Sequence, residues 1–380
     1  MKVYLDNANI GELEKKYCLD ALESGFISTR GPLIKVFEEK FGSYLGGFIC
    51  ATYSGTAGLH LSILYSLKKR NIKGRVGAII PSLTFAATAH AVLYNNLIPV
   101  FVDVHKDTWN MKIDDIPLLI ERCKRVGIDV KFILPVHLYG NPVDMNSLIE
   151  IARQYDLIVI EDAAEALGSF HNQQRCGTIG DFGVFSFNAN KVITASSGGA
   201  IFSKNREDID YIRFLTLQAR NESKGYYHED LGFNYRMTNI EAAILLAQFE
   251  KLDYFLELKR KFFHIYKEIL QDYVDFQLVR DNDISNYWLI SCSFKGLNIE
   301  DLQKKLADKQ IPTRRLFYPL PLMEFYRKYV EMYLEKDIES YYKNSMDVYR
   351  NSLCLPSSTK NTIDAIVFVA NTIKEELQKN

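Results

Sequence analysis

Several polar and aromatic side chains in this 380-residue sequence follow or close short apolar runs of strand length. They are Phe85, His137, Asp162, Ser186 and Lys191. Ligands of open α/β sheets bind outside the carboxyl ends of the strands, so side chains at such positions converge on one edge of a sheet. The sequence therefore predicts one site that combines an aromatic ring, an imidazole, a carboxylate, a hydroxyl and an amine.

Lys191 is the candidate nucleophile of this site. It closes an apolar run and precedes the small, polar stretch 194–200, so its amine can lie in a tight pocket. Desolvation lowers the pKa of a lysine and makes the amine reactive toward carbonyl groups. The alternative is that Lys191 is a solvated surface lysine. Asp162 and Phe85 are expected at neighbouring strand ends, which favours a reactive lysine in a pocket.

A phosphate site is predicted where a turn of small residues opens an amphipathic helix. Ser54 can cap this helix, and the amides of Gly55, Thr56 and Ala57 then point toward a bound anion. The turn is neither a Walker P-loop nor GxGxxG, which argues against an NAD enzyme. A simple helix cap is the alternative. Together with the amine, the carboxylate and the ring, the turn completes the parts of a pyridoxal phosphate site.

The composition of the sequence argues against several classes of binding partner and site. The net charge is −1, so no basic surplus predicts binding to nucleic acid or to an anionic membrane. No segment approaches the ~18 uninterrupted apolar residues of a membrane helix, and residues 1–16 lack the apolar core of a signal peptide. The six cysteines show no CxxC spacing and the seven histidines no HxxxH spacing, so we expect reduced thiols, no metal site and a cytoplasmic enzyme.

The elements that must position these residues alternate along the first 250 positions. Apolar runs of strand length are separated by stretches with apolar residues at three- and four-residue spacings, which predicts an α/β fold with a mostly parallel sheet covered by helices. The runs are Gly77–Ile80, Ile98–Val104, Lys131–Val136, Leu157–Ile160, Gly183–Phe187 and Ala200–Ser203, and the helical stretches include Ala57–Leu67, Met145–Tyr155 and Glu207–Thr216.

The pattern changes near residue 250. We expect one long amphipathic helix over Glu250–Leu270, a strand over Tyr287–Phe294 and helices near Ile299–Lys309 and Thr362–Gln378. We therefore predict a large cofactor-binding domain over 1–250 and a small C-terminal α/β domain over 251–380.

The chain resembles the DegT/DnrJ/EryC1/StrS family of nucleotide-sugar aminotransferases, pyridoxal-phosphate enzymes of fold type I. The resemblance runs over nearly the whole sequence. Its landmarks, in order, are Gly25–Pro32, Ser54–Ala57, Pro81–Phe85, Phe101–Val104, His137–Gly140, Glu161–Ala164, Phe185–Lys191 and Gly232–Met237.

The resemblance implies a role for each matching residue. Lys191 is the Schiff-base lysine and proton carrier, and Asp162 pairs with the pyridine nitrogen. Cofactor binding further involves Gly55, Thr56, Ala57, Phe85, Glu165, Ser186 and, from a partner subunit, Asn234, which implies a homodimer with shared active sites. Thr29, Arg30, His137, Arg314 and Phe317 lie where relatives approach substrate.

Two departures from the family pattern bear on the substrate. Glu165 stands where Gln or His is usual, and Thr194–Gly199 replaces the usual Thr-Gly-Glu-Gly-Gly. Both resemble the members that act on 4-keto-6-deoxy sugars. The resemblance thus implies transfer of an amino group from L-glutamate to C4 of a UDP- or GDP-linked 4-keto-6-deoxy sugar, for cell-surface glycans. The alternatives are amination at C3 of a 3-keto sugar, or a non-catalytic binding or regulatory protein of the same fold.

Overall fold

The centre of the protein is a seven-stranded sheet in the order β1-β9-β8-β5-β4-β2-β3. The computed structural model describes residues 2–335 and 337–379. Neighbours from β8 to β3 are parallel, and β9 is antiparallel to both β8 and β1. The predicted mostly parallel sheet is thus confirmed. The strands are β1 (Phe48–Thr52), β2 (Val76–Pro81), β3 (Ile98–Val102), β4 (Asp129–Ile133), β5 (Ile158–Asp162), β8 (Phe182–Ser186) and β9 (Gly199–Ser203).

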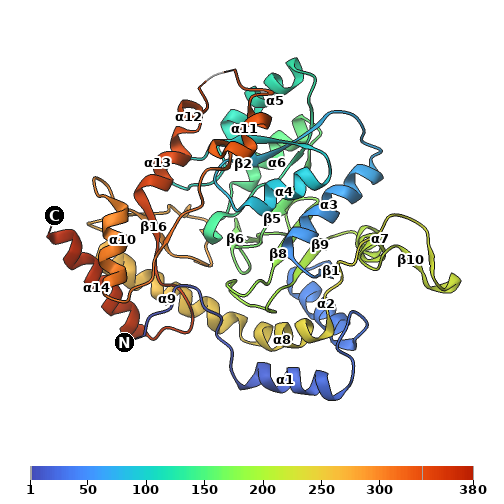
Figure 1. Cartoon of the computed structure of the whole chain (residues 1–380), viewed down its shortest axis with the longest axis horizontal. Helices are drawn as coiled ribbons and strands as arrows, with labels where there is room; N and C mark the ends of the chain where they lie inside the picture. Colours follow the sequence, from blue (N-terminus) through green and yellow to red (C-terminus); the bar gives the residue numbers. More distant parts are fainter. Residues whose placement is uncertain (1, 336, 380) are drawn as a thin grey trace.

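Helices cover the sheet on both faces, because its strands carry apolar side chains on both sides (Figure 1). One core packs α3, α4 and α7 against the sheet, and the other packs α2 and α8 against it. The helices of this part are α1 (Glu12–Glu23), α2 (Pro32–Leu45), α3 (Gly55–Lys69), α4 (Ala86–Tyr94), α5 (Ile116–Arg125), α6 (Met145–Gln154), α7 (Arg206–Thr216) and α8 (Asn239–Glu250).

A second, four-stranded antiparallel sheet follows, in the order β12-β14-β16-β15. It has a separate core with α9, α10 and α14. The strands are β12 (Asp275–Phe276), β14 (Ser291–Ser293), β15 (Arg314–Arg315) and β16 (Ser352–Cys354), and the helices are α9 (Leu252–Leu270), α10 (Ile299–Asp308) and α14 (Ile363–Gln378). Helices α11 (Glu324–Val330), α12 (Ile338–Tyr341) and α13 (Lys343–Asn351) lie between β15 and β16 in sequence. Buried side chains of this part of the chain, among them Leu320, Tyr326 and Tyr333, pack into the core of the large sheet. The domain boundary at residue 250 therefore stays a prediction.

The long helix expected over Glu250–Leu270 is present as α9, which begins two residues later than predicted, at Leu252. Helix α8 ends at Glu250 and α9 begins at Leu252, because Lys251 leaves the helical region with φ −103° and ψ 4°. Neighbouring contacts stabilise this break: Glu14 of α1 binds the Lys251 ammonium and accepts from Gln248 Nε2 at 2.5 Å. The turn between the two helices therefore lies against α1.

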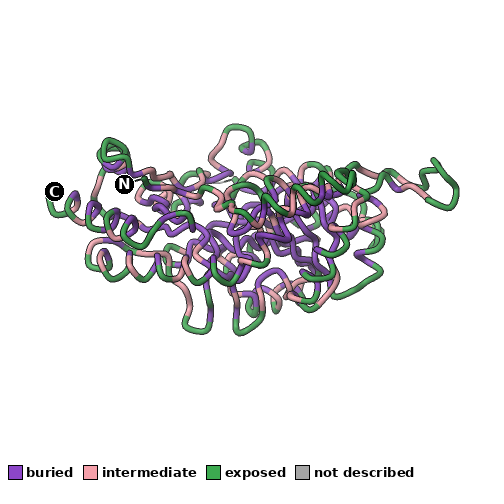
Figure 2. The backbone as a smooth tube through the Cα atoms, turned by 90° about the horizontal axis from the view of Figure 1, so that it is seen from below, coloured by how far each residue is buried: buried purple, intermediate pink, exposed green. Residues whose placement is uncertain are grey.

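Two short hairpins and the chain ends complete the fold. The hairpin of β10 (Arg220–Asn221) and β11 (Tyr227–His228) projects from the body as an arm (Figures 1 and 2). The hairpin of β6 (Phe170–His171) and β7 (Gln174–Arg175) pairs with β13 (Asp283–Ile284). Segment 2–9 runs along segment 357–361, where Tyr4 N–H donates to Asn361 Oδ1 at 2.8 Å and Ser357 N–H to Leu5 O at 2.7 Å. Among the described residues, no helix has the length and apolar character to span a membrane.

Candidate active site

A cavity of about 530 Å³ lies at the carboxyl ends of β2, β5 and β8, beside the first turn of α3. Side chains from both sheets and from the loops between them line it. Its walls include many of the residues predicted from the sequence: Gly55, Thr56, Phe85, Asp162, Glu165, Ser186, Lys191, Arg314 and Phe317.

Lys191 lies in the wall of this cavity, mostly shielded from solvent. Its Nζ is 3.7 Å from Glu165 Oε1 and 4.0 Å from the centroid of the Trp288 ring. Burial lowers the pKa of the Lys191 amine, while the charges of Glu165 and Asp162 oppose this shift. A lysine with a lowered pKa supplies more neutral amine near pH 7, which is the form that attacks a carbonyl group.

Asp162 ends strand β5 and is held by two hydrogen bonds. Thr88 Oγ1 donates to its Oδ2 at 2.7 Å, and Ala164 N–H donates to its Oδ1 at 3.2 Å. Burial raises the pKa of this carboxyl, and the Thr88 hydrogen bond opposes the rise. A cation beside Asp162 would favour its ionised form, so the carboxyl is suited to hold a protonated ring nitrogen.

Glu165 lies three residues farther along the same loop and is also buried. Tyr139 N–H donates to its Oε2 at 2.7 Å. Burial raises the pKa of Glu165 to about 7, although the Lys191 charge opposes this. Two carboxyls and one amine thus share one wall of the cavity, and both carboxyls have raised pKa values.

The cavity lining also contains an anion cradle, at the first turn of α3. Ser54 caps α3 by accepting the Ala57 N–H at 3.1 Å, which leaves the amides of Gly55 and Thr56 without helical acceptors. A Cβ at Gly55 would lie 3.0 Å from Ser186 Cβ, so glycine brings the first turn of α3 close to the Ser186 hydroxyl. Free amides, the positive end of the helix and a hydroxyl favour a phosphate.

Phe85 and the residues of the second sheet form the rim. Phe85 is 59% exposed and its ring centroid is 5.7 Å from that of Phe317. Arg314 Nη1 pairs with Asp6 Oδ2 at 2.7 Å, and Asn190 Nδ2 donates to the same oxygen at 3.2 Å. Segment 2–9 therefore holds a guanidinium at the cavity.

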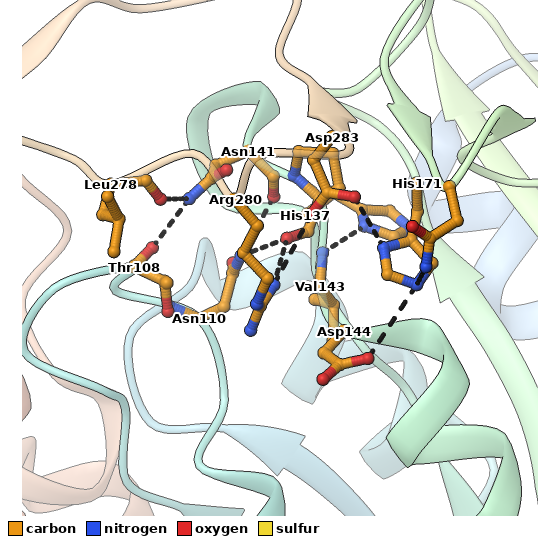
Figure 3. A network of polar contacts seen from close by, with 12 residues as sticks. Thr108, Asn110, His137, Asn141, Val143, Asp144, His171, Leu278, Arg280 and Asp283 are labelled. Atoms are coloured by element: carbon orange, nitrogen blue, oxygen red, sulfur yellow. Dashed lines mark hydrogen bonds and ion pairs between the residues drawn. The ribbon is translucent and has the colours of Figure 1, made fainter.

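His137 does not line the cavity. Its ring is fully buried, and its Nε2 is 3.0 Å from Glu161 Oε2. Its Nδ1 accepts the Val143 N–H at 3.0 Å (Figure 3). Both ring nitrogens are engaged, and Glu161 also accepts the amides of Gly177 and Gly180. A contact of His137 with substrate does not fit these surroundings; the side chain joins the loop after β4 to β5.

Four other predicted residues also lie outside the cavity lining. Ala57 is buried within α3, where its amide is used by the Ser54 cap. Thr29 and Arg30 lie in the loop before α2, where Arg30 Nη2 is 3.6 Å from Glu222 Oε1. Asn234 is exposed at the base of the projecting arm. The roles of these residues toward cofactor and substrate stay predictions.

Trp288, Thr88 and Tyr139 are among the residues at the site that the sequence did not predict. Trp288 covers Lys191 and donates its indole N–H to Asn190 O at 2.7 Å. Thr88 binds Asp162, and the Tyr139 ring stacks on Phe317 with 5.4 Å between centroids. Thr88 follows Phe85 by one helical turn, a spacing that could have indicated it. Trp288 lies in an apolar stretch that is typical of a buried strand, so the sequence around it does not indicate a site residue.

Comparison with known proteins identifies the chain's relatives. The model of the DegT/DnrJ/EryC1/StrS aminotransferase family matches residues 8–374. GDP-perosamine synthase of Escherichia coli O157:H7 is 34% identical over 95% of this chain and 95% of that protein. The dTDP-4-amino-4,6-dideoxy-D-glucose transaminase of Shigella dysenteriae is 29% identical over 98% of this chain and 98% of that protein. The PLP form of Streptococcus pneumoniae Spr1654 has a TM-score of 0.90 over 100% and 99% of the two chains; its 24% identity shows the fold alone.

The cavity fits pyridoxal phosphate by the chemistry of its donors. The amine of Lys191 suits the aldehyde, the carboxyl of Asp162 suits the ring nitrogen, and the cradle at Gly55 and Ser186 suits the phosphate. Phe85 offers an exposed ring for stacking. The chain belongs to the DegT/DnrJ/EryC1/StrS aminotransferase family and is a pyridoxal-phosphate-dependent aminotransferase.

Proposed function

We propose that this enzyme transfers an amino group from L-glutamate to C4 of a nucleotide-linked 4-keto-6-deoxy sugar, for the synthesis of cell-surface glycans. The observation that carries the proposal is the convergence of Lys191, Asp162 and the anion cradle in one cavity of a chain from this family. The names of two relatives, a GDP-perosamine synthase and a dTDP-4-amino-4,6-dideoxy-D-glucose transaminase, support a nucleotide-linked aminodeoxy sugar.

The residues of the cavity have separate tasks in this proposal. Pyridoxal phosphate, when bound, supplies an electron sink for negative charge on the reacting carbon. Asp162 holds the ring nitrogen and keeps its proton in place. Lys191 would hold the cofactor at its aldehyde carbon and would carry a proton to and from the reacting carbon. Glu165 lies 3.7 Å from the Lys191 amine and is suited to influence its protonation.

The rim residues are suited to recognise the two substrates. Arg314 carries a guanidinium at the cavity, and guanidinium groups bind carboxylates and phosphates in a forked geometry. Phe317 and Phe85 present apolar rings on which a deoxy sugar can pack. These assignments predict that Arg314→Ala raises KM for a substrate more than it lowers kcat.

A homodimer with shared sites is part of the proposal. Asn234 and Arg30 lie outside the cavity of their own chain, and the arm beside them projects from the body (Figure 2). The arm carries exposed apolar rings, of which Tyr226 is 86% exposed, and nearby Leu231 is 74% exposed. A partner subunit would cover these side chains and bring Asn234 to its neighbour's cradle. The cytoplasmic location stays a prediction.

The test is a substrate screen with glutamate as the amino donor. UDP-, GDP- and dTDP-linked 4-keto-6-deoxy sugars and a 3-keto sugar are offered separately, and NMR of the products identifies the aminated carbon. We expect amination at C4. Amination at C3 would replace the proposed reaction with the alternative. Borohydride reduction of the enzyme should fix the cofactor on the Lys191 peptide; an unmodified peptide would exclude the role given to Lys191.

A further inference from the structure

Asn286 is a fully buried asparagine in the loop that leads to Trp288. Its Nδ2 donates to the backbone oxygens of Glu165 and Leu167, both at 2.9 Å, and its Oδ1 accepts the Trp288 N–H at 2.8 Å. An asparagine side chain has two donor hydrogens and one acceptor oxygen, so all of its polar groups are used. The side chain thus joins the loop after β5 to the loop before β14.

Both joined segments reach the Lys191 amine. Glu165 places Oε1 3.7 Å from Lys191 Nζ, and the Trp288 ring centroid lies 4.0 Å from it. Each group also has a second hydrogen bond. The Glu165 carboxyl accepts the Tyr139 N–H, and the Trp288 indole N–H donates to the Asn190 carbonyl. The Lys191 amine therefore lies between the Glu165 carboxyl and the Trp288 ring. The backbones of both residues are hydrogen-bonded to the side-chain amide of Asn286.

The fit around Asn286 leaves little room for another arrangement. Gly140 has φ +95°, and a Cβ at this position would lie 1.9 Å from Asn286 Oδ1. Ser169 Oγ accepts the Asn286 N–H at 3.0 Å and donates to Gly140 O at 2.7 Å. Glycine at 140 is therefore required both by its backbone angle and by the close approach of Asn286.

We propose that Asn286 is a positioning residue, which sets the protonation of the Lys191 amine by holding Glu165 and Trp288 on either side of it. The inference deepens the proposed role of Lys191 and rests on it. The other charged groups around the amine are Asp162, Asp6 and Arg314. None of these three is bonded to the Asn286 side chain, so a change at Asn286 acts through Glu165 and Trp288.

The direction of the effect follows from what each neighbour does. Burial is the main cause of the lowered pKa of Lys191, and the Trp288 ring covers the amine. The Glu165 carboxyl opposes the shift, and it keeps its bond from Tyr139 when Asn286 is changed. Loss of the Asn286 bonds leaves the Trp288 N–H without its acceptor, while Asn190 still binds the indole N–H and Lys259 the Trp288 carbonyl. The ring is then held less firmly over the amine and water can enter, so the amine should stay protonated to a higher pH.

The experiment uses cofactor-free Asn286→Ala, together with the milder Asn286→Ser, which retains a donor. An amine-specific acylating reagent is applied across pH, and mass spectrometry of the Lys191 peptide gives the midpoint of labelling. We expect the midpoint to rise by about half a pH unit or more, which lowers labelling near pH 7 by about threefold. In a Trp109→Phe background Trp288 is the single tryptophan, and its emission should shift to the red in the same variants.

Asn141→Ala is the matched control. Asn141 is also buried, and its Nδ2 donates to two backbone oxygens, those of Thr108 and Leu278, at 3.1 and 2.8 Å (Figure 3). Its loss should lower stability to a similar extent and leave the labelling midpoint in place. If the Asn286 variants lose stability in the same way but keep the wild-type midpoint, the positioning role is wrong. Borohydride labelling of the wild type tests the role of Lys191 separately, since the acylation needs no cofactor.

Discussion

Two buried glutamates show how a single residue's surroundings decide its protonation. Glu165 has a pKa raised to about 7, because burial outweighs the nearby Lys191 charge. Glu14 is equally buried, but its pKa is lowered, because bonds from Lys251, Gly11 and Gln248 outweigh the effect of burial. The two residues therefore have opposite effects on how stability changes with pH.

Glu165→Gln should stabilise the cofactor-free protein as the pH rises. The folded state keeps a proton on Glu165 between pH 4.5 and about 7 that the unfolded chain has released. The free energy of unfolding of the wild type therefore falls across this range, and glutamine removes this loss, by on the order of 1–3 kcal/mol above pH 7. Denaturant titrations between pH 5 and 8 measure the difference. Glu14→Gln should instead lose stability at neutral pH; parallel curves for all three proteins would contradict the argument.

Asp162→Asn should retain pyridoxal phosphate but turn over slowly. The variant loses the charge that holds the proton of the ring nitrogen, and hydrogen bonds to charged groups are worth ~1.5–3 kcal/mol. We expect at least about a tenfold fall in kcat, with the cofactor absorbance still present. The control is Asp103→Asn, because Asp103 is buried to the same extent but does not line the cavity; its carboxyl binds Ser82, Asn344 and Ser345. Wild-type turnover of Asp162→Asn would exclude its assigned role.

At the scale of elements, the position of α9 depends on one buried lysine. Lys259 donates to Trp288 O at 2.9 Å and to Ser357 O at 2.8 Å, which joins α9 to the loop before β14 and to the segment after β16. Burial lowers the pKa of Lys259 to about 7. The residue therefore holds the second sheet against the helix as a largely neutral amine at alkaline pH.

Lys259→Met should remove a specific slope in stability above neutral pH. Between pH 7 and about 10 the unfolded chain binds a proton on Lys259 that the folded state has lost, so the wild-type free energy of unfolding rises with pH in this range. The variant lacks this rise and also leaves two carbonyl oxygens without a donor. Thermal unfolding at pH 7, 8 and 9 measures how the stability of each protein changes with pH. Lys261→Met, on the exposed face of α9, is the control. Equal slopes in wild type and Lys259→Met would contradict the assigned pKa.

Elements with a strong local pattern could be predicted, and those decided by distant contacts could not. The apolar runs predicted β2, β5 and β9 within one or two residues, because strands buried on both faces read as continuous apolar sequence. The break at Lys251 has no glycine or proline to mark it, and it depends on Glu14 of α1. Trp288 reaches Lys191 only through the path of the loop that Asn286 fixes. The expected position of His137 directly after an apolar run did not show which way its ring points: β4 ends at Ile133, and the ring lies buried against Glu161.

At the scale of the whole molecule, the proposed shared site can be tested by subunit exchange. Lys191→Ala and Asn234→Ala are each expected to be impaired, the second because it removes a donor to a charged phosphate. In a mixed dimer, one site collects both changes and the other receives an intact Lys191 and an intact Asn234. Activity should therefore return after mixing, up to half the wild-type value per mixed dimer. If exchange is verified and no activity returns, each site is built from one chain.

The pairing of segment 2–9 with segment 357–361 sets an order of events during synthesis. The hydrogen bond from Tyr4 to Asn361 spans 357 positions, so segment 2–9 leaves the ribosome long before its partners do. At ~5–20 residues per second, this interval is about 20–70 s. Asp6 belongs to this segment, and its partner Arg314 also emerges late. A nascent chain therefore carries Lys191 well before the rim of its cavity can close, and the cavity is complete only after segment 357–361 has emerged.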